Sequence, residues 1–190
     1  GYVLVSIFET PSPWISTGIV SIMLLVAAWI ATRPVRHHKG YLSAAIIALA
    51  CSVTLHLAIT LLLVLKADSW FQPQLLIPLA GMYFANTMNA ISLSAERYHS
   101  ELARGQSIKE ARLTAFHAAM IPQINSLLAV GLVALPGMMT GQILSGVSPL
   151  IAVRYQIMIM AMVLGTAGLG ATLMLTLLAR RKNQVSEMPQ

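Results

Sequence analysis

Five long runs that lack Asp, Glu, Lys and Arg divide the chain and limit what it can fold into. They cover residues 14–32, 41–65, 75–94, 115–139 and 155–179. A helix needs about 20 apolar residues to cross the hydrocarbon core of a bilayer. Only 9% of the residues are charged, against about 25% in a soluble domain. The sequence therefore predicts an all-α, polytopic membrane protein with five transmembrane helices, forming one transmembrane domain over residues 1–190.

The basic residues are shared unevenly between the loops. If the five runs cross the membrane in alternation, Lys66 and Arg154 are the only two of the 12 Lys and Arg residues on one side. Short cytoplasmic loops carry an excess of Lys and Arg. The pattern predicts a plasma-membrane (inner-membrane) protein whose N-terminus is outside and whose C-terminus is cytoplasmic. It also accounts for the net charge of +6 without a nucleic-acid partner.

The first eight residues are apolar but too short to span a bilayer. They lack the basic region that opens a signal peptide. We expect them to be the end of an earlier helix, preceded by further spans.

The most charged segment, residues 95–116, joins the third run to the fourth. Gly105 suits the left-handed residue that ends a helix. Ser107 and Glu110 have the spacing of a capping box, which starts one. The sequence therefore predicts two helices that meet at a sharp cytoplasmic turn, here called the elbow. It is either a solvated helical hairpin or a docking surface for a cytoplasmic partner.

Enzyme motifs are absent from the sequence. It contains no CxxC, no HExxH and no Walker A motif, and its five apolar runs contain no carboxylate. We expect no enzyme activity, no cofactor and no ATP binding in this chain. Ion-driven carriers commonly use ionisable groups inside the membrane. A transporter of this composition would therefore draw its energy from elsewhere, although His56 and backbone carbonyls leave a gradient-driven carrier open.

Polar groups inside the runs are the candidates for a transport route. Carboxamides occur in the third run and after Pro122 in the fourth. We expect Pro122, and the stretch at Pro136 and Gly137 near the outer surface, to interrupt the fourth run. They either form hydrogen bonds between helices or line the route. The same alternatives hold for the break, where Gly137 and Gly141 have the spacing of a packing face. The route candidates are Asn86, Asn89, Gln123, Asn125, Pro136, Gly137 and Met138.

A resident metal site is not predicted. No His, Asp and Glu cluster has metal-ligand spacing in the membrane segments. The pair His37 and His38 lies in a cytoplasmic loop, where solvation is the simpler interpretation.

Several stretches between residues 75 and 160 carry a resemblance to a known family. They read IPLAGM (77–82), AAMIPQINS (118–126), LPGMMTGQI (135–143) and RYQI (154–157), with Asn86 and Asn89 after the first. In their order and spacing they resemble the FetB (YbbM) family of ABC-type permeases, which is associated with iron export in bacteria.

The resemblance implies an ATP-driven exporter permease for iron or another metal ion. It implies a separate ATP-binding cassette subunit, a homodimer of permease subunits, and about seven spans in the whole protein. The elbow would be the coupling helix, and Glu101, Ala103 and Gly105 are similar to the acidic-alanine-glycine loop of ABC importers. The residues expected to couple to the ATPase are Glu101, Ala103, Arg104, Gly105, Ser107, Lys109 and Glu110.

Three alternatives to this function stay open. One is a secondary transporter driven by an ion gradient. A second is an ABC permease for a non-metal cargo such as a sugar nucleotide. The third is a membrane scaffold that transports nothing and binds a partner through its basic loops.

Overall fold

A computed structural model describes residues 12–35, 40–67, 69–130 and 136–186, with the backbone alone for 183–186. Every element in these ranges is helical, which confirms the predicted all-α class. The expected earlier helix at residues 1–8 and the pair His37 and His38 lie outside the described residues. The elements are α2 (Pro13–Ala31), the 3-10 turn η1 (Arg33–Val35), α3 (Tyr41–Ala58), its π-helical continuation η2 (Ile59–Val64), α4 (Pro73–Ala103), α5 (Ile108–Ala129), α6 (Gly137–Leu144) and α7 (Pro149–Ser186).

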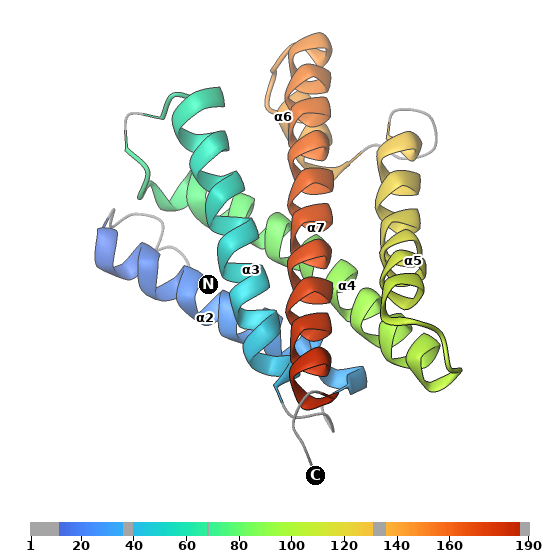
Figure 1. Ribbon diagram of the computed structural model, residues 1–190. Coiled ribbons are helices and arrows are strands. Elements are labelled where there is room, and N and C mark those ends of the chain that lie inside the picture. The colour runs from blue at the N-terminus through green and yellow to red at the C-terminus, as the bar shows by residue number, and fades with distance from the viewer. Residues whose placement is uncertain (1–11, 36–39, 68, 131–135, 187–190) are drawn as a thin grey trace.

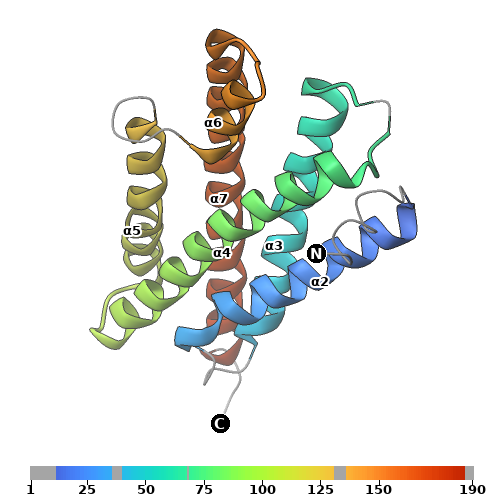
Figure 2. The same ribbon diagram turned by 180° about the vertical axis from the view of Figure 1, so that it is seen from behind.

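Helix α7 is the centre of the arrangement and packs against α3, α4 and α5 (Figure 1). The end of α2 with η1, the turn from α4 to α5 and the end of α7 lie at one end of the molecule (Figure 2). Helix α6 and the start of α7 lie at the other. At the first end, Arg181 of α7 donates hydrogen bonds to the carbonyl of Gly40 and to Oγ of Ser43. These bonds join the end of α7 to the start of α3. We call this end of the molecule, which also holds the turn from α4 to α5, the elbow end.

Three described helices are long and apolar enough to cross a membrane: Pro13–Ala31, Tyr41–Val64 and Pro149–Lys182. The predicted count of five spans is therefore not confirmed. Helices α4 and α5 have 31 and 22 residues, enough length to cross the roughly 30 Å hydrocarbon core at 1.5 Å per residue. Their carboxamides lower the mean hydropathy, so apolar character alone does not mark them as spans.

The fourth predicted run does not form one helix. Helix α5 ends at Ala129, and the separate helix α6 begins at Gly137. Pro122 lies inside α5 without ending it. The break instead lies between Ala129 and Gly137, and Pro136 precedes the first residue of α6 with an extended backbone. The predicted boundaries 115–139 were wrong, although a helix break at Pro136 and Gly137 was expected correctly.

Small residues let the central helices approach closely. Ala90 of α4, Ala119 of α5 and Ala167 and Ala171 of α7 form one buried cluster. Gly170 of α7 adds a second close approach. A Cβ built at Gly170 would lie less than 3.0 Å from the Thr87 methyl group, which is closer than real Cβ atoms approach other heavy atoms. It would also lie 3.3 Å from Ser52 Oγ. Helices α3, α4 and α7 meet at this point because Gly170 has no side chain.

Substitution of this glycine gives a first prediction. Gly170→Ala should lower the free energy of unfolding by about 1–3 kcal/mol, because the stiff, β-branched Thr87 cannot move aside. Gly168→Ala is the matched control on the same helix. Its Cβ would meet only the flexible end of Met120, at 3.6 Å, so its effect should be neutral or stabilising by up to about 1 kcal/mol. Unfolding of both variants in detergent tests this, and equal stabilities would contradict it.

Candidate functional site

The elbow begins with a tight turn at the end of α4. Gly105 adopts a φ of 85°, in the left-handed region that favours glycine. The N–H of Gly105 donates to the carbonyl of Leu102 at 3.1 Å, and the N–H of Gln106 donates to the carbonyl of Glu101 at 3.2 Å. This bond pair is a Schellman motif, which satisfies the last carbonyls of a helix. The predicted left-handed glycine is confirmed, and it reverses the chain within a few residues.

The second half of the elbow is a capping box at the start of α5. The Ser107 Oγ accepts from the N–H of Glu110 at 3.3 Å, and the Glu110 carboxylate accepts from the N–H of Ser107 at 3.2 Å. The Ser107 hydroxyl also donates to this carboxylate at 2.7 Å. The side-chain bond from Ser107 and then its backbone bond hold the pKa of Glu110 below its usual value. The capping box therefore stabilises the fold fully at a pH above the ordinary pKa of a Glu carboxyl group. This stabilisation is lost as the pH falls through the lowered pKa of Glu110 in the folded protein.

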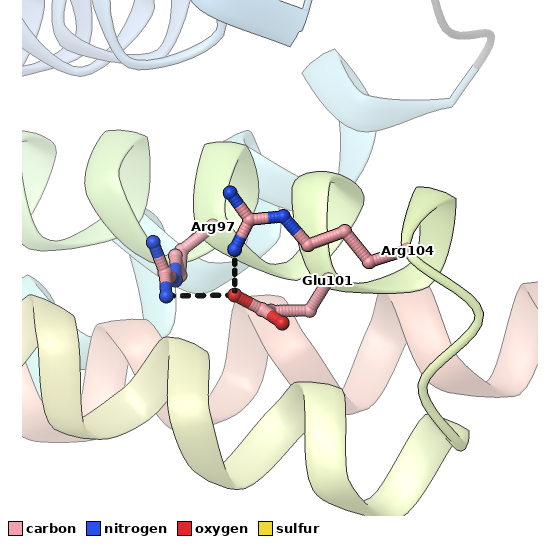
Figure 3. Close-up of polar contacts among 3 residues, drawn as sticks. All are labelled: Arg97, Glu101 and Arg104. Atoms are coloured by element: carbon pink, nitrogen blue, oxygen red, sulfur yellow. Dashed lines mark hydrogen bonds and ion pairs between the residues drawn. The ribbon is translucent and has the colours of Figure 1, made fainter.

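A buried carboxylate lies beneath the turn. Glu101 is 2% exposed, although it carries a charge. Its Oε1 pairs with Arg97 Nη2 at 2.7 Å and with Arg104 Nη1 at 3.3 Å. Figure 3 shows both guanidinium groups converging on this one oxygen. The two arginines tie the last turns of α4 together and compensate a charge that would be costly to bury alone.

Most of the residues predicted to couple to an ATPase form the outer surface of the elbow. Glu101 is the exception, because its burial makes it a support for the turn and not part of the contact surface. The exposed members are Ala103, Arg104, Gly105, Ser107, Lys109 and Glu110.

Sequence reasoning missed the partners that hold the elbow. Arg97 stands four residues before Glu101, a spacing that pairs charges on a helix, so the pair was visible in the sequence. The contact of Arg112, in contrast, could not be foreseen from the sequence. Its Nη2 donates to Thr176 Oγ1 of α7 at 3.1 Å, across 64 positions in sequence. This bond fastens the start of α5 to the central helix.

The carboxamides of the membrane segments lie in different environments. Asn86 donates to the carbonyl of Met82 on its own helix at 2.8 Å. Gln123 is 7% exposed. Asn89 and Asn125 are exposed side chains on α4 and α5. Amides that face outward on helices of a membrane protein need a partner beyond this single chain, which is compatible with a route or with a second subunit.

The helix break at the far end of the molecule presents an open surface. Gly137, Met138 and Gly141 are exposed, and Pro136 is partly buried. A Cβ added at Gly137 or Gly141 would meet nothing in the described structure within 4 Å. Within the described residues these two glycines therefore pack against no other helix of this chain, and the packing-face and route interpretations both stay open.

No group of three or more His, Cys, Asp or Glu side chains that could hold a metal ion occurs in the described ranges. Three cavities, of about 300, 390 and 370 Å³, are lined by residues other than the route candidates. The route candidates therefore do not share any of these three cavities.

Fold and site together describe a helical membrane protein whose described basic residues lie mostly in the helix ends at the elbow end. Comparison of sequences specifies the family. The model of the uncharacterised protein family UPF0014 matches residues 1–182, and the chain belongs to this family.

Curated relatives from bacteria and plants agree with this assignment. The membrane protein slr1647 of Synechocystis is 36% identical over 87% of this chain and 70% of its own length. The probable iron export permease protein FetB of Escherichia coli is 34% identical over 96% of this chain and 74% of its own. The protein ALUMINUM SENSITIVE 3 of Arabidopsis thaliana is 32% identical over 88% of this chain and 66% of its own. No solved structure matches the chain.

Proposed function

We propose that this chain is the membrane subunit of an ATP-driven exporter, coupled through its elbow to a separate ATP-binding cassette subunit. The cargo we propose is iron or another metal ion, because the E. coli relative is named a probable iron export permease. The permease would work as a homodimer in the plasma membrane, with the elbow end in the cytoplasm. Helices α4 and α5 would complete five spans in this chain.

The observation that carries this proposal is the geometry of the elbow. A coupling element must transmit force, so it must be both rigid and exposed. The Schellman motif, the capping box and the buried Glu101 make the turn rigid. Arg104 and Glu110 leave a charged outer surface free to meet another protein.

The topology supports the same assignment. The elbow lies at the same end of the molecule as η1 and the end of α7 (Figure 1), and these two elements contain Arg33, Arg180 and Arg181. Lys66 follows η2, and Arg154 belongs to the start of α7, which lies at the other end. Cations gather on the cytoplasmic side of membrane proteins, and a cytoplasmic ATPase can reach only that side.

Transport in vesicles tests the proposal. The full chain is reconstituted with and without its ATP-binding partner, and uptake of Fe²⁺ into inverted vesicles is measured. We expect uptake that needs both the partner and ATP. Uptake without the partner that collapses with the proton or sodium gradient would instead establish a secondary carrier. Uptake of a sugar nucleotide but not of Fe²⁺ would reject the metal cargo, and no uptake of either would favour a scaffold.

Exposed carboxamides give a prediction about the route. Asn89→Leu and Asn125→Leu should each lower transport by about two- to tenfold. This factor corresponds to the free energy of one neutral hydrogen bond to the cargo or to its hydration water. Thermal unfolding should stay unchanged, because both side chains are exposed in the described part of the chain. Thr54→Leu, at another exposed polar side chain of a membrane helix, should leave transport unaltered. Full transport by both asparagine variants would exclude them from the route.

A further inference from the structure

A groove between α5 and α7 has a basic end and an apolar end. Its elbow-end portion is a cavity of about 300 Å³ lined by Lys109, Arg112, Leu113, Phe116, Thr172 and Leu175. A second cavity of about 370 Å³ continues it along α5. That cavity is lined by Phe116, His117, Met120, Ile121, Ile124 and Leu164. The two cavities share Phe116, and the helices that flank them lie side by side in both views (Figures 1 and 2).

Two uncompensated cations stand at the basic end. Neither Lys109 nor Arg112 forms an ion pair within the described part of the chain, where both ion pairs belong to Glu101. The nearby Glu110 carboxylate is occupied by Ser107. Arg112 is held in place by its bond to Thr176. The groove therefore presents a fixed positive charge to whatever enters it.

The position of the groove along α5 matches the boundary between lipid headgroups and acyl chains. Charged residues of α5 end at Arg112, and no further Asp, Glu, Lys or Arg follows in that helix. Leu113 is 58% exposed and begins the apolar portion, and Ile121 is likewise 58% exposed. Such a change from cations to exposed apolar side chains is expected where headgroups meet acyl chains.

We infer that this groove binds one anionic phospholipid, with the headgroup phosphate at Lys109 and Arg112 and an acyl chain along Phe116, Met120 and Ile121. Basic pockets between membrane helices suit anionic headgroups, and the apolar continuation suits a lipid better than a free anion. The inference is independent of the transported cargo. It places a lipid against the first turn of α5, beside the capping box, where its presence would stabilise the elbow.

Lipid titration followed by native mass spectrometry tests the inference on the full chain in detergent. Phosphatidylglycerol is compared with phosphatidylcholine of the same acyl chains, and inorganic phosphate is added as a competitor. We expect the first phosphatidylglycerol to bind at least about fivefold more tightly than phosphatidylcholine, since each nearby cation contributes about 1 kcal/mol. Inorganic phosphate should not displace it. Equal binding of both lipids, or displacement by phosphate, would overturn the inference.

Variants distinguish lipid binding in this groove from non-specific attraction of anionic lipid to a positively charged protein. Lys109→Gln and Arg112→Gln should each weaken the first phosphatidylglycerol by about fivefold. Arg180→Gln removes an exposed cation of the same end and should leave that affinity unchanged. Thr172→Trp keeps both cations but fills the groove at an exposed position, so it should also weaken binding. An equal loss in Arg180→Gln, or full binding by Thr172→Trp, would contradict a lipid in this groove.

Discussion

Gly105→Val should abolish coupling while leaving the helices folded. At a φ of 85°, a β-branched residue costs about 1–3 kcal/mol, enough to open the turn that sets α5 against α4. A Cβ at this position would meet nothing within 4 Å, so the strain is confined to the backbone. We expect transport with the ATP-binding partner to fall about 5- to 150-fold, since each 1.4 kcal/mol corresponds to a factor of ten.

Two variants isolate the cause of this loss. Gly105→Asn should retain most of the transport, because asparagine tolerates the left-handed conformation. Gly146→Val imposes the same strain on a glycine with a φ of 88° at the opposite end of the molecule, and it should leave coupling intact. Transport and substrate-stimulated ATP hydrolysis are measured together. Normal stimulation in Gly105→Val, or equal uncoupling in Gly146→Val, would contradict the role of the elbow.

Removal of both arginines around Glu101 should produce the largest loss of stability. The double variant Arg97→Ala and Arg104→Ala leaves a carboxylate that is 2% exposed without a compensating charge. Breaking a buried pair in this way costs about 3 kcal/mol or more. Arg104→Ala alone should cost less than Arg97→Ala alone, because the Arg104 side chain is 63% exposed and its contact is longer.

The triple variant that adds Glu101→Gln provides the decisive comparison. With the carboxylate gone, no unpaired charge is buried, and at least half of the lost stability should return. A control that removes the exposed cations of Arg154 and Arg180 should stay within about 0.5 kcal/mol of the parent. Unfolding in detergent is measured for the parent, both single variants, the double variant, the triple variant and the control. A triple variant no more stable than the double variant would show that the stability loss does not come from the unpaired Glu101 carboxylate.

The elbow could be predicted in detail because its chemistry is local. Gly105 ends one helix, and Ser107 with Glu110 starts the next, through bonds that span three to five residues. Such bonds need no distant neighbour, so residue type and spacing are sufficient to foresee them. The all-α class followed for a similar reason, since long apolar runs leave the helix as the conformation that satisfies the backbone in lipid.

The span count and the fourth run were harder to predict. A run without charges does not need to be one helix, and α5 stops seven residues before Pro136. Pro122 shows the converse, because a proline expected to interrupt the run lies within a continuous helix. Carboxamides in α4 and α5 make their mean hydropathy ambiguous, so absence of charge was a weaker signal of a span than it looked.

From the amino-acid sequence alone came the helical class, the basic elbow and the turn chemistry at Gly105. The burial of Glu101, the close approach at Gly170 and the groove between α5 and α7 were decided by tertiary structure. The physical reason is one of distance along the chain. Capping and left-handed turns depend on neighbouring residues, whereas burial and grooves depend on which helices pack together. Arg112 reached Thr176 across 64 positions only because α5 and α7 lie side by side.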